Sequence, residues 1–278
     1  MGIWTGLDEQ DIQSSPPATM FPPTSNRQSP SSITILGIPV CDVTTEEALA
    51  LIDRFVHDKS PHQLCTVNPE FIMAAQHDAE FRRVLQRSAL NLPDGVGVLW
   101  AARRLGHPLR ERVAGSDLVG RIADRAQATG WRIFLLGAAE GVAERAAQIL
   151  QLRYPQTHFV GVYAGSPNIE EEADIATRIR SARADILMVA YGAPGQDKWI
   201  ARNIERTGAA VALGIGGSLD FIVGKQKRAP RWMQRSGLEW LYRLAREPRR
   251  WRRQLALPRF VWRILCYHFI NPHHGGSS

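Results

Sequence analysis

Short apolar runs alternate with longer amphipathic segments along most of this chain. Six runs have the length and the continuous apolar character of buried strands: Gln63–Val67, Ala89–Leu92, Arg132–Leu136, His158–Tyr163, Ile186–Ala190 and Ala210–Ile215. The segments between them repeat apolar residues at helical spacing, near residues 70–87, 95–104, 116–129, 139–153, 170–183 and 195–206. Apolar strands that alternate with helices are typical of βαβ units. The pattern therefore predicts an α/β fold, a Rossmann-like parallel sheet with helices on both faces.

The ends of the chain have a different character. Residues 1–32 are rich in Pro and Ser without periodicity, which predicts a disordered arm. A first apolar run starts at Ile33, and Thr44 with Glu47 forms a capping box that predicts a helix through about Val56. We expect the catalytic domain to span residues 33–224. A basic, Trp-rich helical appendage follows over residues 225–270, in which Pro258 opens the last helix, and residues 271–278 form a flexible tail.

The appendage holds most of the positive charge. Residues 225–263 contain thirteen Lys and Arg and two acids, Glu239 and Glu247, and four of the eight tryptophans. The whole chain has 34 Lys and Arg against 27 Asp and Glu, so 21 basic and 25 acidic residues remain elsewhere. Cations interleaved with aromatics fit a partner with negative charge and an apolar layer, namely a membrane surface or a nucleic acid. A solvated basic helix is the plain alternative.

Other features narrow the class of protein. No apolar run approaches the roughly 18–20 residues that a membrane-spanning helix needs, and the N-terminal segment does not read as a secretory signal. The three cysteines are widely separated and form no CxxC pair, which favours a reducing compartment and argues against a structural zinc site.

Polar and glycine-bearing loops follow five of the predicted elements. They are residues 66–70 (TVNPE), 92–95 (LPDG), 112–117 (RVAGSD), 191–198 (YGAPGQDK) and 214–220 (GIGGSLD). Ligands of parallel α/β sheets bind beyond the carboxyl ends of the strands, so we expect these loops to line one site. Taken singly, Asp94 could be a turn residue and Asn68 a helix cap. The glycine pattern is not a dinucleotide-binding fingerprint at the first βα turn, so an NAD-dependent enzyme is disfavoured.

Several catalytic motifs are missing from the sequence. It has no Asp-x-Asp pair to grip a metal-bound diphosphate, no GxxxxGK[ST], no GxSxG and no HExxH, and its histidines lie outside the strand-end loops. A histidine general base is therefore disfavoured.

Jointly, the five loops and the basic C-terminus make the chain resemble the WecG/TagA/CpsF glycosyltransferases, glycosyltransferase family 26. The resemblance runs from about Ile33 to Arg263, and its fourth block extends to Trp199. It implies an inverting, metal-independent, UDP-sugar-dependent hexosyltransferase without a cofactor, at the cytoplasmic face of the bacterial inner membrane. Such enzymes transfer a sugar to a polyprenyl-diphosphate-linked acceptor in cell-wall polymer or exopolysaccharide biosynthesis. ManNAc, ManNAcA and glucose all remain open as the sugar, and a homo-oligomer is possible.

The resemblance also assigns roles to residues. Asp94 matches the proposed general base, and Thr66 and Asn68 match polar residues of the same pocket. The expected substrate-binding residues are Arg112, Gln196, Asp220, Arg243, Arg250 and Arg253. Among them, Arg112 precedes a helix N-terminus that suits an anion, Gln196 and Asp220 match positions near the nucleotide, and the last three arginines match ones proposed to close over the diphosphate.

Physical chemistry is consistent with this assignment. One carboxylate can take the proton of an acceptor hydroxyl, and UDP is a good leaving group whose charge arginines can stabilise. The appendage would also dock on the anionic membrane. The alternative, a nucleic-acid-binding protein that uses the same basic segment, gives no reason for Asp94 or the Gln196 loop. We therefore expect no nucleic-acid partner.

Overall fold

The structure is a computed structural model that describes residues 30–226, 229–230, 233, 239–246, 251 and 255–270. The side chains of residues 243 and 267–270 are outside this description, as are residues 1–29 and 271–278, where we predicted an arm and a tail.

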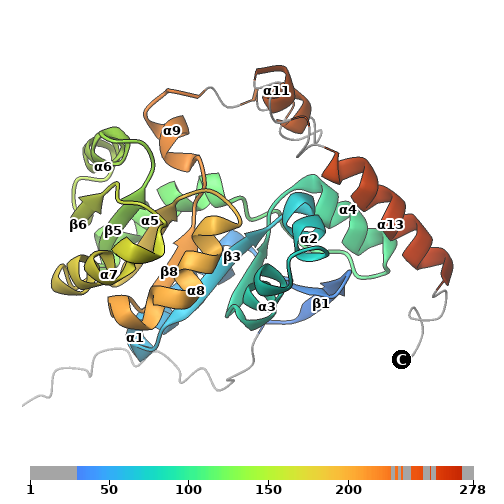
Figure 1. Cartoon of the computed structure of the whole chain (residues 1–278), viewed down its shortest axis with the longest axis horizontal. Helices are drawn as coiled ribbons and strands as arrows, with labels where there is room; N and C mark the ends of the chain where they lie inside the picture. Colours follow the sequence, from blue (N-terminus) through green and yellow to red (C-terminus); the bar gives the residue numbers. More distant parts are fainter. Residues whose placement is uncertain are drawn as a thin grey trace, which may run out of the picture.

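A parallel sheet of six strands forms the centre of the molecule (Figure 1). Its order is β4 (Leu90–Pro93), β3 (His62–Val67), β8 (Val211–Gly214), β7 (Ile186–Ala190), β5 (Arg132–Gly137) and β6 (His158–Tyr163). All six strands are the ones that the apolar runs predict. Every neighbouring pair is parallel, so the predicted Rossmann-like α/β class is confirmed.

Helices cover both faces of this sheet. One face carries α1 (Thr45–Asp58), α5 (Gly115–Thr129) and α6 (Val142–Arg153), and the other carries α3 (Ala79–Arg87), α7 (Glu172–Ser181) and α8 (Gly195–Thr207), with η1 (Ile169–Glu171) leading into α7. The alternation of β5 shows how the strands serve both layers. Ile133 and Leu135 pack against the first set of helices, whereas Phe134 and Leu136 pack against α7 and α8.

One local prediction needs correction, and the first apolar run has a partner strand that was not predicted. A single helix was expected near residues 70–87, but the structure has α2 (Pro69–Ala75) and then α3, because the Asp78 side chain accepts a hydrogen bond from the Phe81 N–H at 2.9 Å and starts a new helix. The first apolar run is one arm of a hairpin, β1 (Ser32–Ile35) and β2 (Ile38–Cys41), joined through Leu36 and Gly37, which both have positive φ.

The capping box at the start of α1 is confirmed. The Glu47 N–H donates to Oγ1 of Thr44 at 3.2 Å, and the Thr44 N–H donates to Oε2 of Glu47 at 3.0 Å. Two orphan N–H groups of the first turn are therefore satisfied.

The C-terminal elements are α9 (Ser218–Ile222), α11 (Glu239–Arg246) and α13 (Ala256–Ile270). α13 lies along α2 and along α4 (Val96–Arg104), and it begins two residues before Pro258 (Figure 1). Phe260 and Ile264 are each 1% exposed and join the apolar cluster of α2, α3 and α4. Within the described part of the chain, no helix combines the length and apolar character needed to span a bilayer.

Candidate active site

Four of the predicted site residues meet in one cavity of about 170 Å³ beyond the carboxyl ends of the strands. Thr66 and Asn68 come from the end of β3, Asp94 follows β4, and Gln196 lies in the first turn of α8. The glycine-rich loop after β8 completes the wall. This convergence follows from the sheet order, because β4, β3, β8 and β7 are consecutive neighbours.

Asp94 is held in place by both its backbone and its side chain. Its N–H donates to the Val67 carbonyl at 2.8 Å, and Oδ2 accepts from the Gly115 N–H at 3.3 Å. Gly115 is the first residue of α5, so the carboxylate lies at a helix N-terminus, where negative charge is favoured. The turn at Pro93-Asp94-Gly95 thus aims an anionic side chain into the cavity.

Thr66 and Gly115 pack closely where β3 meets α5. A Cβ on Gly115 would lie 3.1 Å from both Oγ1 and Cγ2 of Thr66, which is tighter than nearly all real contacts. Glycine at this position lets the start of α5 approach the strand, and the approach brings the helix N–H within reach of Asp94.

Asn68 has a structural role as well as a place in the cavity wall. Its Oδ1 accepts from the Phe71 N–H at 3.0 Å and caps α2, with Pro69 at the first helical position. The simpler interpretation of Asn68 as a helix cap is therefore confirmed for one of its two polar atoms, and the residue also lines the cavity.

Gln196 joins two of the loops. It is 2% exposed, and its Oε1 accepts from the N–H of Gly192 at 3.1 Å and from the N–H of Gly216 at 3.0 Å. Its amide lies over Gly214, where a Cβ would come within 2.3 Å of Nε2. A side chain at Gly214 would displace Gln196, so the glycine permits the bridge between the β7–α8 and β8–α9 loops.

Glu70 and Glu239 also line this cavity, and sequence reasoning missed both. Glu70 occupies the first turn of α2, where an acid is ordinary, and Glu239 comes from α11 in the appendage. Asp94 is therefore one of three carboxylates at the site within the described part of the chain.

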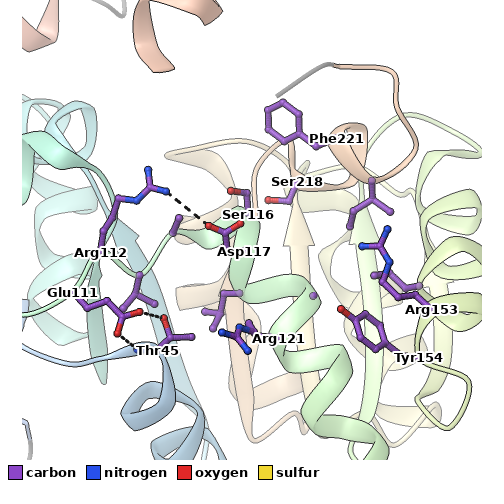
Figure 2. Close-up of a pocket in the computed structure, with 16 residues that line it drawn as sticks. Thr45, Glu111, Arg112, Ser116, Asp117, Arg121, Arg153, Tyr154, Ser218 and Phe221 are labelled. Atoms are coloured by element: carbon purple, nitrogen blue, oxygen red, sulfur yellow. Dashed lines mark hydrogen bonds and ion pairs between the residues drawn. The ribbon is translucent and has the colours of Figure 1, made fainter. Parts of the chain in front are cut away.

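A larger cleft of about 560 Å³ adjoins the cavity and shares Ala114, Ser116, Ser218 and Phe221 with it. Arg112, Arg121 and Arg153 line it (Figure 2). Arg112 contacts Oδ2 of Asp117 at 3.9 Å and Oε2 of Glu239 at 3.7 Å. This predicted substrate-binding arginine therefore ties α11 to the core beside the cavity.

Comparison with known proteins identifies the family. The model of the WecG/TagA/CpsF glycosyl transferase family matches residues 33–273. The protein belongs to this family. It is a glycosyltransferase, as the resemblance of its motifs implied.

Three similar curated proteins share one name, N-acetylglucosaminyldiphosphoundecaprenol N-acetyl-beta-D-mannosaminyltransferase. The protein of Bacillus subtilis (strain 168) is 34% identical over 233 residues, covering 84% of this chain and 90% of the relative. That of Bacillus spizizenii (strain ATCC 23059 / NRRL B-14472 / W23) is 34% identical over 216 residues, covering 77% and 83%. That of Staphylococcus aureus (strain MW2) is 30% identical over 240 residues, covering 86% and 94%.

The other residues predicted for the site are either outside both cavities or outside the described part of the chain. Asp220 lies on α9, its Oδ2 is 3.7 Å from where a Cβ of Gly217 would stand, and it is not among the described residues that line either cavity. The backbone of Arg243 belongs to α11, but its side chain lies outside the described part, as do Arg250 and Arg253 entirely. Lys198, part of the family motif, pairs instead with Asp78 at 2.7 Å and with Glu80 at 2.9 Å, and so fastens α8 to α3.

A buried acid beneath the site was missed. Asp197 follows Gln196, is 1% exposed, and has its pKa raised by burial from 3.8 to about 7. Among the described residues, neither carboxyl oxygen of Asp197 has a partner at good hydrogen-bond geometry. Burial therefore raises the pKa more than the nearby Cys65 and Gln196 side chains lower it. An Asp in the first turn of a helix is usually exposed, so its sequence context contained no sign of this burial.

Proposed function

We propose that the protein transfers N-acetylmannosamine from a UDP-sugar to an N-acetylglucosaminyl-diphospho-polyprenol, with inversion at the anomeric carbon. The names of the curated relatives support this acceptor and this sugar. The observation that carries the proposal is the Asp94 carboxylate, held at the N-terminus of α5 in a cavity with Thr66 and Asn68.

In this mechanism Asp94 takes the proton of the acceptor hydroxyl as its oxygen attacks the anomeric carbon of the donor. The new C–O bond forms on the face opposite the nucleotide. The bond to the UDP oxygen breaks and its electron pair leaves with UDP, so one displacement inverts the configuration. The nearby Thr66 hydroxyl and Asn68 amide have the chemistry to orient the sugar hydroxyls.

The departing diphosphate needs positive charge, and we propose that arginines supply it in place of a metal ion. Guanidinium groups bind phosphate oxygens in bidentate fashion and stabilise charge that develops during the reaction. Arg112 lies next to the cavity and pairs with Glu239 of α11. This pair supports a role for Arg243 on the same helix, and the proposal extends to Arg250 and Arg253. Turnover should then persist in excess EDTA, whereas a requirement for added Mg²⁺ or Mn²⁺ would contradict the proposal.

We further propose that the appendage binds the cytoplasmic face of the bacterial inner membrane. Of the nine exposed large apolar side chains among the described residues, six belong to the appendage: Trp240, Leu241, Trp251, Leu255, Val261 and Trp262. Apolar side chains among cations suit an anionic lipid surface. Flotation of the full chain with anionic vesicles, but not with neutral ones, is the expected result. Salt-sensitive DNA binding without flotation would favour the nucleic-acid alternative.

The catalytic proposal is tested with Asp94→Asn beside Glu70→Gln, which neutralises a second carboxylate of the same cavity. A panel of UDP-sugars is incubated with N-acetylglucosaminyl-diphosphate acceptors, and the products are weighed by mass spectrometry. We expect UDP-N-acetylmannosamine to be the donor. Asp94→Asn should lower kcat by about 10²-fold or more, the usual scale for a general base, while donor binding is kept. A larger loss in Glu70→Gln than in Asp94→Asn would assign the base to Glu70.

A further inference from the structure

An apolar groove of about 240 Å³ lies between α2, α3 and α13, outside the cavity that contains Asp94. Its apolar lining consists of Phe71, Met73, Ala74, Phe81, Ala193, Pro194 and Ala256. The rings of Phe71 and Phe81 meet edge to face with their centroids 5.3 Å apart, and Phe81 is fully buried. The groove is thus an apolar depression on a well-packed base.

The groove adjoins the candidate active site. Glu70, Phe71 and Ala193 line both the groove and the cavity of Asp94. The two spaces therefore meet at the start of α2, where Asn68 caps the helix and also lines the cavity. A ligand that places one end at Asp94 would therefore need to pass only these shared residues to reach the groove.

One wall of the groove is formed by α13, which has both buried and exposed apolar side chains. α13 is fixed to the core by Phe260 and Ile264, and Nη1 of Arg263 donates to Oε1 of Gln76, the C-cap of α2, at 3.2 Å. The same helix exposes 40% of Val261 and 69% of Trp262 to solvent. Exposed apolar groups beside an apolar groove suit a hydrocarbon chain that arrives from a lipid surface.

We propose that this groove binds the first isoprene units of the lipid-linked acceptor, while the acceptor sugar lies at Asp94. The assignment rests on the proposed function, which supplies an acceptor with a sugar at one end and a prenyl chain at the other. The diphosphate between them passes the junction beside Glu70. Arg259, which lines the groove, supplies positive charge on that path.

Filling the groove tests the assignment. Ala74→Trp and Ala256→Trp add a large side chain from opposite walls, and Ala79→Trp adds the same side chain at an exposed position on α3 that does not line the groove. Each variant is assayed with two acceptors, N-acetylglucosaminyl-diphosphate linked to a farnesyl chain or to an ethyl group. The KM ratio of the two acceptors isolates the contribution of the prenyl chain.

We expect the wild type to prefer the farnesyl acceptor. The groove-filling variants should raise KM for that acceptor about tenfold more than KM for the ethyl acceptor, a loss equal to exposing roughly two methylene groups. Ala79→Trp should keep the wild-type ratio. An unchanged ratio in both groove variants, or a wild type that does not distinguish the acceptors, overturns the assignment. If neither acceptor is used although the UDP-sugar binds, the proposed function itself fails and the groove assignment fails with it.

A second measurement uses the unmodified full chain. A farnesyl diphosphate that carries a terminal benzophenone is cross-linked to the protein, and the labelled peptides are mapped. Labels within α2, α3 or α13 support the assignment. Labels confined to other elements, including the exposed apolar residues of α11, would mean that the prenyl chain lies elsewhere.

Discussion

Replacing Asp197 with Asn should change how stability depends on pH. Burial raises the pKa of Asp197 from 3.8 to about 7, so between these pH values the folded protein keeps a proton that the unfolded chain releases. Rising pH therefore favours the unfolded chain in the wild type, until Asp197 is ionised in both states above about pH 7. Each unit of difference between the folded and unfolded pKa corresponds to about 1.4 kcal/mol, which gives about 4 kcal/mol over the whole range and about 3 kcal/mol between pH 5 and pH 8.

The groups around Asp197 do not add a pH dependence of stability of their own between pH 5 and pH 8. The Cys65 thiol, which faces Asp197, has its pKa raised well above 9.0 by its own burial and then by the Asp197 charge, so it stays protonated up to pH 8. Gln63 donates from Nε2 to the Asp197 carbonyl at 2.8 Å and carries no charge. Lys198 is paired with Asp78 and Glu80 at the start of α3 and is not among the causes of the Asp197 shift. We therefore assign the expected change in the free energy of unfolding between pH 5 and pH 8 to Asp197.

Urea unfolding followed by tryptophan fluorescence at several pH values measures this term. The free energy of unfolding of Asp197→Asn should lack the decline of the wild type, so the two curves separate by about 3 kcal/mol between pH 5 and pH 8. Asp185→Asn is the matched control. Burial raises the pKa of Asp185, but hydrogen bonds from the Arg132 side chain and backbone outweigh burial and lower it, so its contribution changes only in acid. Parallel curves for Asp197→Asn and the wild type would show that Asp197 is ionised in the folded protein.

Three further substitutions probe the loops and the first helix. Gln196→Leu removes the acceptor of the Gly192 and Gly216 N–H groups, so it should lower the free energy of unfolding by about 2 kcal/mol in urea and should also lower kcat. Wild-type values of both quantities would refute the bridging role. Gly115→Val crowds Thr66 and moves the N–H that contacts Asp94, so turnover should fall by about tenfold or more while the circular dichroism spectrum is kept. Thr44→Ala breaks the capping box and should cost about 1 kcal/mol of stability without changing kcat, and a loss of turnover at full stability would contradict a purely structural role.

The sheet and its helices were readable from the sequence because strands buried on both faces are apolar throughout. That signal identified β3, β4, β5, β7 and β8, whereas β6, an edge strand that is only partly buried, was identified by its apolar residues alone. The signal failed at β2, since Pro39 interrupts the apolar pattern. The turn before β2 was also hidden, because Leu36 has a φ of 48°, and Gly or Asn usually occupies such a position in β-hairpin turns. The break between α2 and α3 was missed for another reason. Apolar residues continue at helical spacing on both sides of Asp78, and only its side-chain cap ends the periodicity.

The site was partly readable because loops after parallel strands share one edge of the sheet. Polar residues in such loops, including Thr66, Asn68, Asp94 and Gln196, could be expected at one edge of the sheet. The strand order, which makes β4, β3, β8 and β7 neighbours, then brings them into one cavity. Glu70, Glu239 and Asp197 could not be expected, since each is an acid in the first turn of a helix, where acids are common. Their proximity to the cavity is decided by tertiary packing, which local patterns do not encode.

The strand order also explains why α11 of the appendage lies beside the cavity that contains Asp94. β8 is the last strand in the described part of the chain but occupies the middle of the sheet, between β3 and β7. The chain therefore leaves the sheet at Gly214, in the wall of the cavity, and Ser218 and Phe221 of α9 line the same space. The segment after α9 therefore starts at the candidate active site, and the contact between Arg112 and Glu239 places α11 beside it. A basic segment attached at this point can reach a bound diphosphate and a lipid surface together, which a segment attached to an edge strand such as β6 could not do without crossing the sheet.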